Sequence, residues 1–597
     1  MQENNQKNSL DQIRHSAEHV LTQAMQRLFP KKFIMAMGPS TDDGFYFDFE
    51  TLGDFKISED DFPAIEAEMT KIIKENLPIV RQEISLDEAK KLFADNPYKM
   101  EWLESIKDRG EIITIYKTGD EFVDLCAGPH VRYTKQIKAF KLLSIAGAYW
   151  HGSEKNKMLT RIYGTAFESK EDLQNYLTNI EEAKKRDHRK LGKDLDLFSI
   201  DEQVGPGLIL WHPKLSIVRE EIENYWRQEH RKNGYQYVYT PHVGQSNLWE
   251  TSGHLVSFKD GLFPPMSMST KDKEENVTYY VKPMSCPFHI RIYKSRPRSY
   301  RELPLRWCEL GSVYRYEESG VLHGMLRVRG FTQDDAHIIC REDQFVKEVN
   351  SILDFALSIN KTFGYDKLNV YLSIRDPENK TKYVGEERIW QLAENTLKEI
   401  LDKRKIEYQT DIGGAKFYGP AIDLKAVDAM GREWQGTTIQ LDMNEPSRFE
   451  MAYVGEDGKE HTPIMLHRTL LGSMERFVGT LIEHYAGAFP VWLSPVQVKI
   501  IPITDEQLEY AQKIEQFLKD KNIRVELDDK SETMQNKIRT AAGEKIPYMI
   551  IIGGREAENN TISVRQRDGQ DLGVMPLEKF LENIEDQISK KSLNLIK

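Results

Sequence analysis

The chain has 597 residues, of which 40% are apolar and 29% are charged, and its formal net charge is −12. This length predicts about three or four globular domains, and the composition excludes a disordered or low-complexity chain. Because the net charge is negative, the protein surface as a whole is not basic, so a nucleic acid would have to bind at local basic patches.

The first residues, MQENNQKNSLDQ, lack the basic start and apolar centre of a signal peptide, and no apolar run approaches the length of a membrane span. We therefore expect a cytoplasmic protein with no membrane segment. The few cysteines do not form a disulfide framework, so each is a buried thiol, a ligand or a nucleophile: Cys126, Cys286, Cys308 and Cys340. Cys308 and Cys340 stand among apolar residues and are expected to be core thiols.

The first predicted element is an amphipathic helix over residues 12–28. Its apolar positions form one stripe at 100° per residue: Ile13, Ala17, Val20, Leu21, Ala24 and Leu28. His15 and His19 fall on the opposite face, which argues against a core histidine. Three interpretations remain, namely a solvated face, half of a metal site, or acid and base groups in a cleft. The spacing by itself favours the solvated face.

The rest of the segment 1–168 mixes helical and strand-like stretches and predicts one α+β unit. An amphipathic helix is expected over 61–76, and strands within IITIYK and DEFVDLCAGPH. Residues 169–193 are rich in charge and end in a basic run, so we expect a solvated connecting helix followed by a domain boundary.

A long central domain is expected over 194–493, with a helix that ends at Gly234 and a strand that Pro241 stops. Residues 303–338 contain two strand-like runs and a turn at 320–324. In an antiparallel hairpin Arg315 and Glu317 share one face, which would offer a cation for phosphate and an acceptor for an exocyclic amino group.

The same domain ends in a helix after Gly472 with an apolar stripe: Met474, Phe477, Val478, Leu481, Ile482 and Tyr485. Arg476 lies off this stripe in the first turns, where a cation opposes the helix dipole. This placement suggests a role other than helix stability. Beyond it, residues 494–597 alternate short β-rich runs with helical segments over 505–521 and 532–542, which predicts a small α/β domain.

Three ordered motifs in this sequence resemble those of class II aminoacyl-tRNA synthetases: VYTP ending at residue 241, VYRYE at 313–317 and GSMERF at 472–477. Longer strings resemble the threonyl-tRNA synthetase family over essentially the whole chain: KPMSCPFH, RVRGFTQDDAHI, KFYGPAID, LHRTLLGSMERF and DLCAGPH. The resemblance implies an α+β editing domain at 1–168, a linker helix at 169–193, a class II antiparallel-sheet catalytic domain at 194–493 and an α/β anticodon-binding domain at 494–597.

The resemblance implies ATP-dependent ligation of L-threonine to the 3′ end of tRNA(Thr) through a threonyl-adenylate, with Mg²⁺ accompanying ATP. It assigns Arg315 to the α-phosphate, Glu317 to adenine, and Phe331 and Arg476 to the two faces of the adenine ring, where stacking on an aromatic ring and a guanidinium suits a planar base. His254 matches a family histidine near the terminal ribose of the tRNA.

The family holds a catalytic zinc ion, and the resemblance assigns its ligands to Cys286, His337 and His467. No local metal motif joins these positions. Three N and S ligands leave coordination open for substrate, and threonine offers both an amino group and a hydroxyl that valine lacks. The remaining predicted threonine contacts are Asp335, which would accept from that hydroxyl, and Gln333, Tyr418 and Gln440.

Serine also carries a hydroxyl, and one missing methyl is worth only about 10- to 200-fold in selectivity, so a second, hydrolytic site is expected. The resemblance places it in the N-terminal domain, at His15, His19, Lys99, Asp124, Cys126 and His130. By spacing alone, one His-x₃-His pair (His15 and His19) together with one Cys-x₃-His pair (Cys126 and His130) would also suit a four-ligand zinc site. The resemblance implies that the histidine pair of the editing site works without a metal ion.

The resemblance further assigns anticodon reading to Glu556 and Arg565 and implies a homodimer through the first motif. The sequence is expected to depart from the family in three ways, by lacking its small extreme N-terminal domain, by carrying Ala127 where a basic residue is common, and by a longer loop over 255–280. Two other function classes stay open, namely a tRNA-binding paralogue without catalysis and a free-standing thiol or metal hydrolase built on Cys126.

Overall fold

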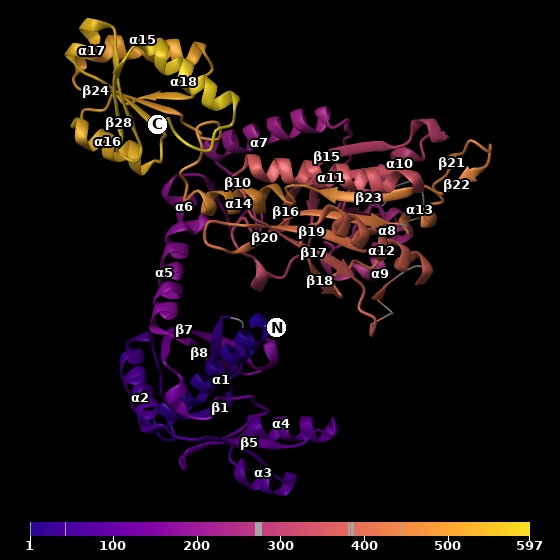
Figure 1. Ribbon diagram of the computed structural model, residues 1–597, viewed down its shortest axis with the longest axis vertical. Coiled ribbons are helices and arrows are strands. Elements are labelled where there is room, and N and C mark those ends of the chain that lie inside the picture. Colours follow the sequence, from indigo (N-terminus) through magenta and orange to yellow (C-terminus); the bar gives the residue numbers. More distant parts are fainter. Residues whose placement is uncertain are drawn as a thin grey trace. The chain divides into compact units, whose positions relative to one another are not determined.

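The computed structural model describes residues 2–41, 43–268, 277–379, 382–383, 387–442 and 444–596, without the side chains of residues 2–8. The chain divides into two compact units, Met1–Glu181 and Glu182–Lys597, whose elements are traced in Figure 1. Among the described helices, none is both long and apolar enough to span a membrane.

The first unit packs helix α1 against a sheet in the order β1-β3-β8-β7, with β2 at the edge of β3, and holds a second, three-stranded sheet β4-β5-β6. Its elements are α1 (Gln2–Leu28), β1 (Phe33–Met37), β2 (Ser40–Thr41), β3 (Gly44–Thr51), α2 (Phe62–Glu75), β4 (Ile79–Glu83), α3 (Leu86–Leu92), α4 (Pro97–Asp108), β5 (Thr114–Thr118), β6 (Phe122–Leu125), β7 (Ala139–Tyr149) and β8 (Met158–Phe167). The predicted apolar stripe of α1 lies in the core of this unit from Ile13 to Ala24. Leu28, at the end of the helix, is exposed, so the prediction is wrong for that residue. The expected helix over 61–76 is α2, and the two expected strands are β5 and β6.

Helix α1 differs from the prediction on its other face. His19 is fully buried and His15 is half-buried, so the solvated-face interpretation is wrong. The ring of His19 packs against His130 and Phe122, with centroid distances of 4.1 and 5.3 Å. The helix is therefore covered on both sides, by the sheet on one and by β6 and the chain that follows it on the other.

Helix α5 (Lys170–Arg186) has no buried residue, as expected for a solvated connector, but α6 (His188–Asp194) buries His188, Leu191 and Gly192. The expectation of a solvated helix through residue 193 is therefore wrong for its last turns.

The second unit is built on a sheet in the order β11-β15-β16-β23-β20-β19-β17-β18, antiparallel except at its two end pairs. Its elements up to residue 484, besides α6, are β9 (Phe198–Ser199), β10 (Leu210–Trp211), α7 (Pro213–Lys232), β11 (Gln236–Tyr237), β12 (Val243–Gln245), α8 (Ser246–Ser252), α9 (His254–Ser257), β13 (Met266–Met268), β14 (Val277–Val281), α10 (Cys286–Tyr293), β15 (Leu305–Tyr314), β16 (Gly330–Cys340), α11 (Glu342–Thr362), β17 (Leu368–Ile374), α12 (Glu387–Arg404), β18 (Gln409–Ile412), β19 (Ala421–Val427), β20 (Glu433–Asp442), α13 (Glu445–Arg448), β21 (Tyr453–Val454), β22 (Glu460–His461), β23 (Ile464–Thr469) and α14 (Met474–His484).

One face of this sheet packs against α7, α11 and α14 and forms the largest core of the unit. Helix α11 contacts β16 and β20 (Figure 1). Cys308 and Cys340 lie in this core, as expected for inert thiols. Because side chains alternate along a strand, the opposite face of β16 stays free for polar residues. The expected long loop over 255–280 lies partly outside the described residues.

The last part of the chain folds into a mixed sheet, β25-β24-β26-β27-β28, parallel at one end and antiparallel at the other. Its elements are β24 (Val498–Pro502), α15 (Leu508–Asp520), β25 (Val525–Leu527), α16 (Met534–Gly543), β26 (Tyr548–Ile552), α17 (Gly554–Asn559), β27 (Ile562–Gln566), β28 (Asp571–Met575) and α18 (Leu577–Ser589). The predicted alternation of strands and helices is confirmed.

Candidate active site

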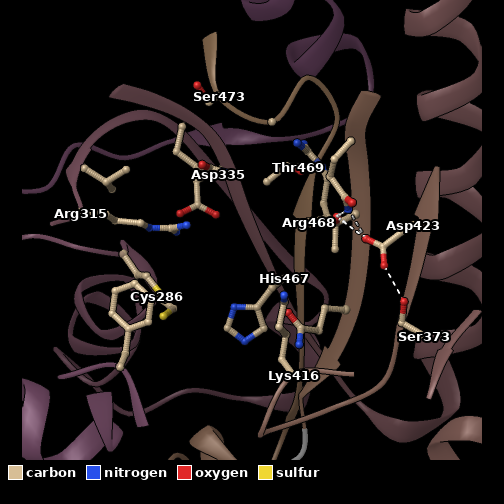
Figure 2. A pocket seen from close by; sticks show the side chains of 18 of the residues that line it. Cys286, Arg315, Asp335, Ser373, Lys416, Asp423, His467, Arg468, Thr469 and Ser473 are labelled. Carbon is tan, nitrogen blue, oxygen red and sulfur yellow. Dashed lines mark hydrogen bonds between the residues drawn. The ribbon is translucent and has the colours of Figure 1, made fainter. Parts of the chain in front are cut away.

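A cavity of about 1110 Å³ opens on the polar face of the large sheet. Nearly all the site residues predicted for this part of the chain line it: Cys286, Arg315, Glu317, Phe331, Gln333, Asp335, His337, Tyr418, Gln440, His467 and Arg476. Figure 2 shows Cys286, Arg315, Asp335 and His467 pointing into the same space.

Strand register brings these residues together. His337 of β16 lies directly opposite His467 of β23, and His467 lies opposite Gln440 of β20. Opposite residues of neighbouring strands share a face of the sheet, so the three side chains form a row across it. On β16, Asp335 lies two residues before His337, so its side chain points to the same face of the sheet.

The predicted metal ligands Cys286, His337 and His467 have ligand atoms that all lie within 4.8 Å of one another. Nε2 of His337 faces Nδ1 of His467 at 3.0 Å. The other nitrogen of each ring already has a partner, since Nδ1 of His337 lies 2.7 Å from Nδ1 of His289 and Nε2 of His467 lies 2.8 Å from an oxygen of Asp442.

This arrangement fits a zinc ion. One thiol and two imidazoles are ligands that zinc prefers, and each imidazole is oriented by a hydrogen bond on its far nitrogen, as is usual for zinc-bound histidine. The two nitrogens that remain available face each other. His289 was not singled out from the sequence, although it closes the KPMSCPFH string.

The predicted ATP residues lie where β15 and β16 approach the end of the hairpin. Strand β15 ends at Tyr314, so Arg315 and Glu317 lie in the following loop and not on a strand face as expected, although the N–H of Arg315 still donates to Arg329 across the hairpin (2.8 Å). The guanidinium carbon of Arg315 lies 5.2 Å from the ring centroid of Phe331.

Two cations face this end of the cavity. Burial lowers the pKa of Arg315, and burial followed by the charge of Arg327 lowers the pKa of Arg476. Nε of Arg476 donates to the carbonyl of Leu326 (3.0 Å), and Glu317 pairs with Arg327 at 2.9 Å. A desolvated guanidinium that opens onto a cavity suits an anionic ligand.

The remaining predicted pocket residues line the wall near His467. The ring of Tyr418 lies 5.2 Å from that of His467, and Nε2 of Gln440 donates to the carbonyl of Gly419 (3.3 Å). Burial raises the pKa of Asp335. A carboxyl group at this depth is a strong acceptor for a hydroxyl of a bound molecule.

The cavity also contains polar residues that the sequence analysis did not single out. Asp423 accepts hydrogen bonds from Ser373 (2.7 Å; Figure 2) and Thr438 (2.6 Å), and Lys416 lines another part of the same cavity. Lys416 and Asp423 begin and end the KFYGPAID string, which contains the signal, although the prediction from this string names only Tyr418.

His254 lies apart from the lining residues. It is fully buried at the start of α9, with Nδ1 2.7 Å from the hydroxyl of Ser252 and Nε2 3.0 Å from the sulfur of Met284. Met284 does line the cavity. Burial, with a smaller contribution from the charge of Arg315, lowers the pKa of His254 to about 4.

The first unit brings the six residues of the predicted second site into one cluster. Sγ of Cys126 lies 3.4 Å from Nε2 of His15 and 3.2 Å from Nε2 of His130, and Nζ of Lys99 lies 2.6 Å from an oxygen of Asp124. His19 completes the cluster, with Nε2 3.8 Å from the same carboxylate.

Burial controls the charges in this cluster. It lowers the pKa of His15 to about 4 and that of His130 to about 2, and it raises the pKa of Cys126 to about 12. Near neutral pH the imidazoles are therefore neutral and the sulfur is a thiol. A thiolate nucleophile needs a lowered pKa, so this environment argues against a hydrolase that attacks through Cys126.

The two predicted anticodon residues lie on separate elements of the last sheet domain. Glu556 lies in the first turn of α17, where its carboxylate accepts the N–H of Gly553 (2.9 Å) and so caps its own helix. Arg565 lies half-buried on β27 opposite Met549.

Comparisons with known proteins cover both units. Residues 269–485 match the family model of the tRNA synthetase class II core domain (G, H, P, S and T), residues 497–587 match the anticodon binding domain, and residues 113–163 match the threonyl and alanyl tRNA synthetase second additional domain.

Similar curated proteins include the threonine–tRNA ligases of Aquifex aeolicus, 53% identical over 98% of this chain and 90% of that protein, and of Dehalococcoides mccartyi, 51% identical over 98% of both. Among solved structures, the RNA binding domain of threonyl-tRNA synthetase from Cryptosporidium parvum aligns with a TM-score of 0.63 and 35% identity, covering 67% of this chain and 98% of that one.

Proposed function

This chain belongs to the threonine–tRNA ligase family and is an aminoacyl-tRNA synthetase, and from that premise we propose that it joins L-threonine to tRNA(Thr) through a threonyl-adenylate. The observation that carries the proposal is the register that sets His337, His467 and Gln440 in one row, within a cavity that also holds Arg315 and Arg476.

In the first step the threonine carboxylate attacks the α-phosphorus of ATP, the bond to the β-phosphate breaks, and pyrophosphate leaves with Mg²⁺. Arg315 neutralises charge that develops on the α-phosphate oxygens. Phe331 and Arg476 cover the two faces of adenine, and Glu317 accepts from its exocyclic amino group. In the second step the 3′-hydroxyl of the tRNA attacks the adenylate carbonyl and AMP leaves.

Cys286, His337 and His467 would hold a zinc ion. When bound, zinc offers open coordination positions to the amino group and the hydroxyl of threonine. Asp335 accepts a hydrogen bond from that hydroxyl, and Gln333, Tyr418 and Gln440 complete the wall of the threonine pocket. Valine lacks the hydroxyl and leaves these groups unpaired, which supports rejection by about 10⁴- to 10⁵-fold.

His254 lies behind Met284, so contact with the terminal ribose of the tRNA requires that Met284 move or that the ribose reach past it. We assign His254 to the second step on its distance of 3.0 Å from the sulfur of this lining residue. Its neutral imidazole can accept a hydrogen bond from a ribose hydroxyl.

The cluster in the first unit hydrolyses seryl-tRNA(Thr) that the synthetic site cannot avoid making. Neutral His15 and His130 can accept a hydrogen bond from the attacking water and so position it, while Lys99 and Asp124 orient the ester. Cys126 contributes a neutral thiol and is not the nucleophile. The hydrolysis needs no metal in this assignment.

The proposed domains are an editing domain at 1–168, a linker at 169–193, a catalytic domain at 194–493 and an anticodon-binding domain at 494–597. Glu556 and Arg565 contact the anticodon, and two copies pair through the segment that ends at Pro241. The small last domain explains how an acidic chain binds tRNA, since only local contacts are needed.

Threonine-dependent exchange of pyrophosphate into ATP tests the proposal. We expect strong exchange with threonine, weaker exchange with serine and negligible exchange with valine. Comparable exchange with valine would refute the zinc-based selection, and no exchange with any amino acid would indicate a paralogue that binds tRNA without activating an amino acid.

A further inference from the structure

His188 is a fully buried histidine in a segment that its sequence presents as a charged linker. It is the first residue of α6, directly after Asp187, whose carboxylate caps this helix. Burial of an imidazole is costly unless its nitrogens find partners. The partners of His188 come from two distant parts of the chain.

Both ring nitrogens of His188 form hydrogen bonds. Nδ1 lies 2.7 Å from a carboxylate oxygen of Glu483 in α14, and Nε2 accepts the backbone N–H of Met325 at 3.0 Å. Because an N–H donor faces Nε2, the ring is the neutral tautomer with its proton on Nδ1. The backbone N–H of His188 also donates to Glu483 (3.1 Å). Neither ring nitrogen is left for a metal ion, although Asp187 and Glu483 lie close by.

Glu483 is itself held in place. Its second oxygen pairs with Arg432 at 2.5 Å. Burial by itself would raise the pKa of Glu483, but the hydrogen bonds from His188 and the charge of Arg432 outweigh burial and lower it. The carboxylate is therefore charged near neutral pH, and it fixes the orientation of the imidazole.

Two glycines show how closely the loop around Met325 wraps this ring. Gly324 has a φ of +50°, and a Cβ there would lie 2.0 Å from Nε2 of His188. In α14, a Cβ on Gly479 would lie 3.1 Å from side-chain atoms of both Met325 and Leu326. A side chain at either glycine would separate the loop from the helix, so the loop, the helix and the imidazole form one packed contact.

The residues that follow Met325 contact two of the residues proposed to bind ATP. The carbonyl of Leu326 accepts Nε of Arg476 (3.0 Å), and Arg327 pairs with Glu317 (2.9 Å). Both contacts begin within two residues of the N–H that His188 accepts. The position of that N–H thus affects the position of both side chains.

We propose that His188 is a positioning residue of the ATP site, which holds the loop at Met325 so that Leu326 and Arg327 place Arg476 and Glu317 for the nucleotide. The inference rests on the proposed ATP-binding roles of Arg476 and Glu317. His188 does not touch the nucleotide and acts only through this loop.

The test is the full-length His188→Ala variant in threonine-dependent ATP–pyrophosphate exchange. We expect the KM for ATP to rise about tenfold while the KM for threonine changes by less than about twofold. A glutamine side chain can donate to Glu483 and accept from Met325 at the same time, so His188→Gln should recover most of the ATP affinity. A merely structural role would lower the active fraction, and with it the apparent kcat, at unchanged KM.

Tyr365→Phe is the matched control, because it removes another buried hydrogen bond to α14, from the Tyr365 hydroxyl to Thr480 (3.2 Å), without touching the loop. Its KM for ATP should stay at the wild-type value. If His188→Ala does not fold, Gly324→Ala disturbs the same contact through its added Cβ and should raise the KM for ATP in the same way.

An unchanged KM for ATP in His188→Ala overturns the inference. If only Gly324→Ala folds, an unchanged KM for ATP in that variant does the same. A rise in the KM for ATP of Tyr365→Phe equal to that of His188→Ala also overturns it. Arg476→Ala, measured alongside, separates this result from a failure of the proposed function. If Arg476→Ala raises the KM for ATP and the His188 variants do not, only the positioning role is wrong. If Arg476→Ala has no effect either, the ATP assignment itself is wrong.

Discussion

Replacing Arg476 by alanine removes a guanidinium that α14 holds at the edge of the cavity. The side chain is half-buried, its Nε donates to the carbonyl of Leu326 (3.0 Å), and burial lowers its pKa. It remains charged, because a guanidinium is not deprotonated in proteins. In the proposed complex this cation covers one face of adenine.

The expected loss has two parts. A cation over a planar aromatic ring contributes about 0.5 to 2 kcal/mol, and a hydrogen bond that involves a charged group contributes about 1.5 to 3 kcal/mol. Together they give about 2 to 5 kcal/mol, which corresponds to about 30- to 5,000-fold in kcat/KM for ATP. The lost bond to Leu326 costs about 1.5 to 3 kcal/mol of folding stability, which is less than the about 5 to 15 kcal/mol typical of a folded protein, so the variant should fold.

The assay is pyrophosphate exchange with ATP varied at saturating threonine, with zinc content measured on the same samples. Arg341→Ala is the matched control, since Arg341 pairs with Asp343 on the surface and should leave both readouts unchanged. A decrease of less than about threefold in kcat/KM for Arg476→Ala would show that Arg476 makes no contact with the nucleotide. Loss of zinc would show that the substitution disturbs the whole cavity.

Three further predictions concern the metal, the second site and a buried acid. Cys286→Ala should lose both zinc and threonine activation while keeping its fold, and full zinc occupancy by elemental analysis would refute the ligand assignment. His15→Ala and Cys126→Ala should activate threonine normally but deacylate seryl-tRNA(Thr) at least about tenfold more slowly. Deacylation by these variants at the wild-type rate would contradict the second site. If a chelator abolishes deacylation by the wild-type protein, a metal at this site is favoured. Burial raises the pKa of Glu475 to about 7 from 4.5, so the folded chain binds this proton more tightly than the unfolded chain and loses stability as pH rises from about 4.5 to about 7. Glu475→Gln lacks this loss, on the order of 3 kcal/mol, so thermal unfolding should show its advantage over wild type growing between pH 5 and pH 8; a constant difference would refute it.

Much of the local structure follows from the sequence. The apolar stripe of α14 is buried from Met474 to Ile482 as its spacing predicts, whereas Tyr485 follows the helix and is half-buried. The spacing succeeds within the helix because a helix of known period presents a fixed set of residues to one side. The alternation along GFTQDDAHI likewise places Asp335 and His337 on one face of a strand. The order of the three motifs was enough to indicate the family, since each motif is local and keeps its residues at fixed spacing.

The sequence failed where a second surface covers an element. The spacing of His15 and His19 gives their angle around the helix axis correctly, but it contains no information about what packs on that side. His130 and Phe122 cover it. His188 shows the same limit, since a charged segment predicts exposure while its partners come from Met325 and Glu483.

The sequence by itself thus determined the period of each element, the residues that share a face, and the motifs that indicate the family. Only the tertiary structure decided which faces meet. His337 and His467 become neighbours through the pairing of β16 with β23, and no local pattern contains that register, because it depends on how the whole sheet buries its apolar face against α7, α11 and α14. The same packing sets Lys416 and Asp423 beside the cavity and encloses His188 between a loop and a helix that are far apart in the chain.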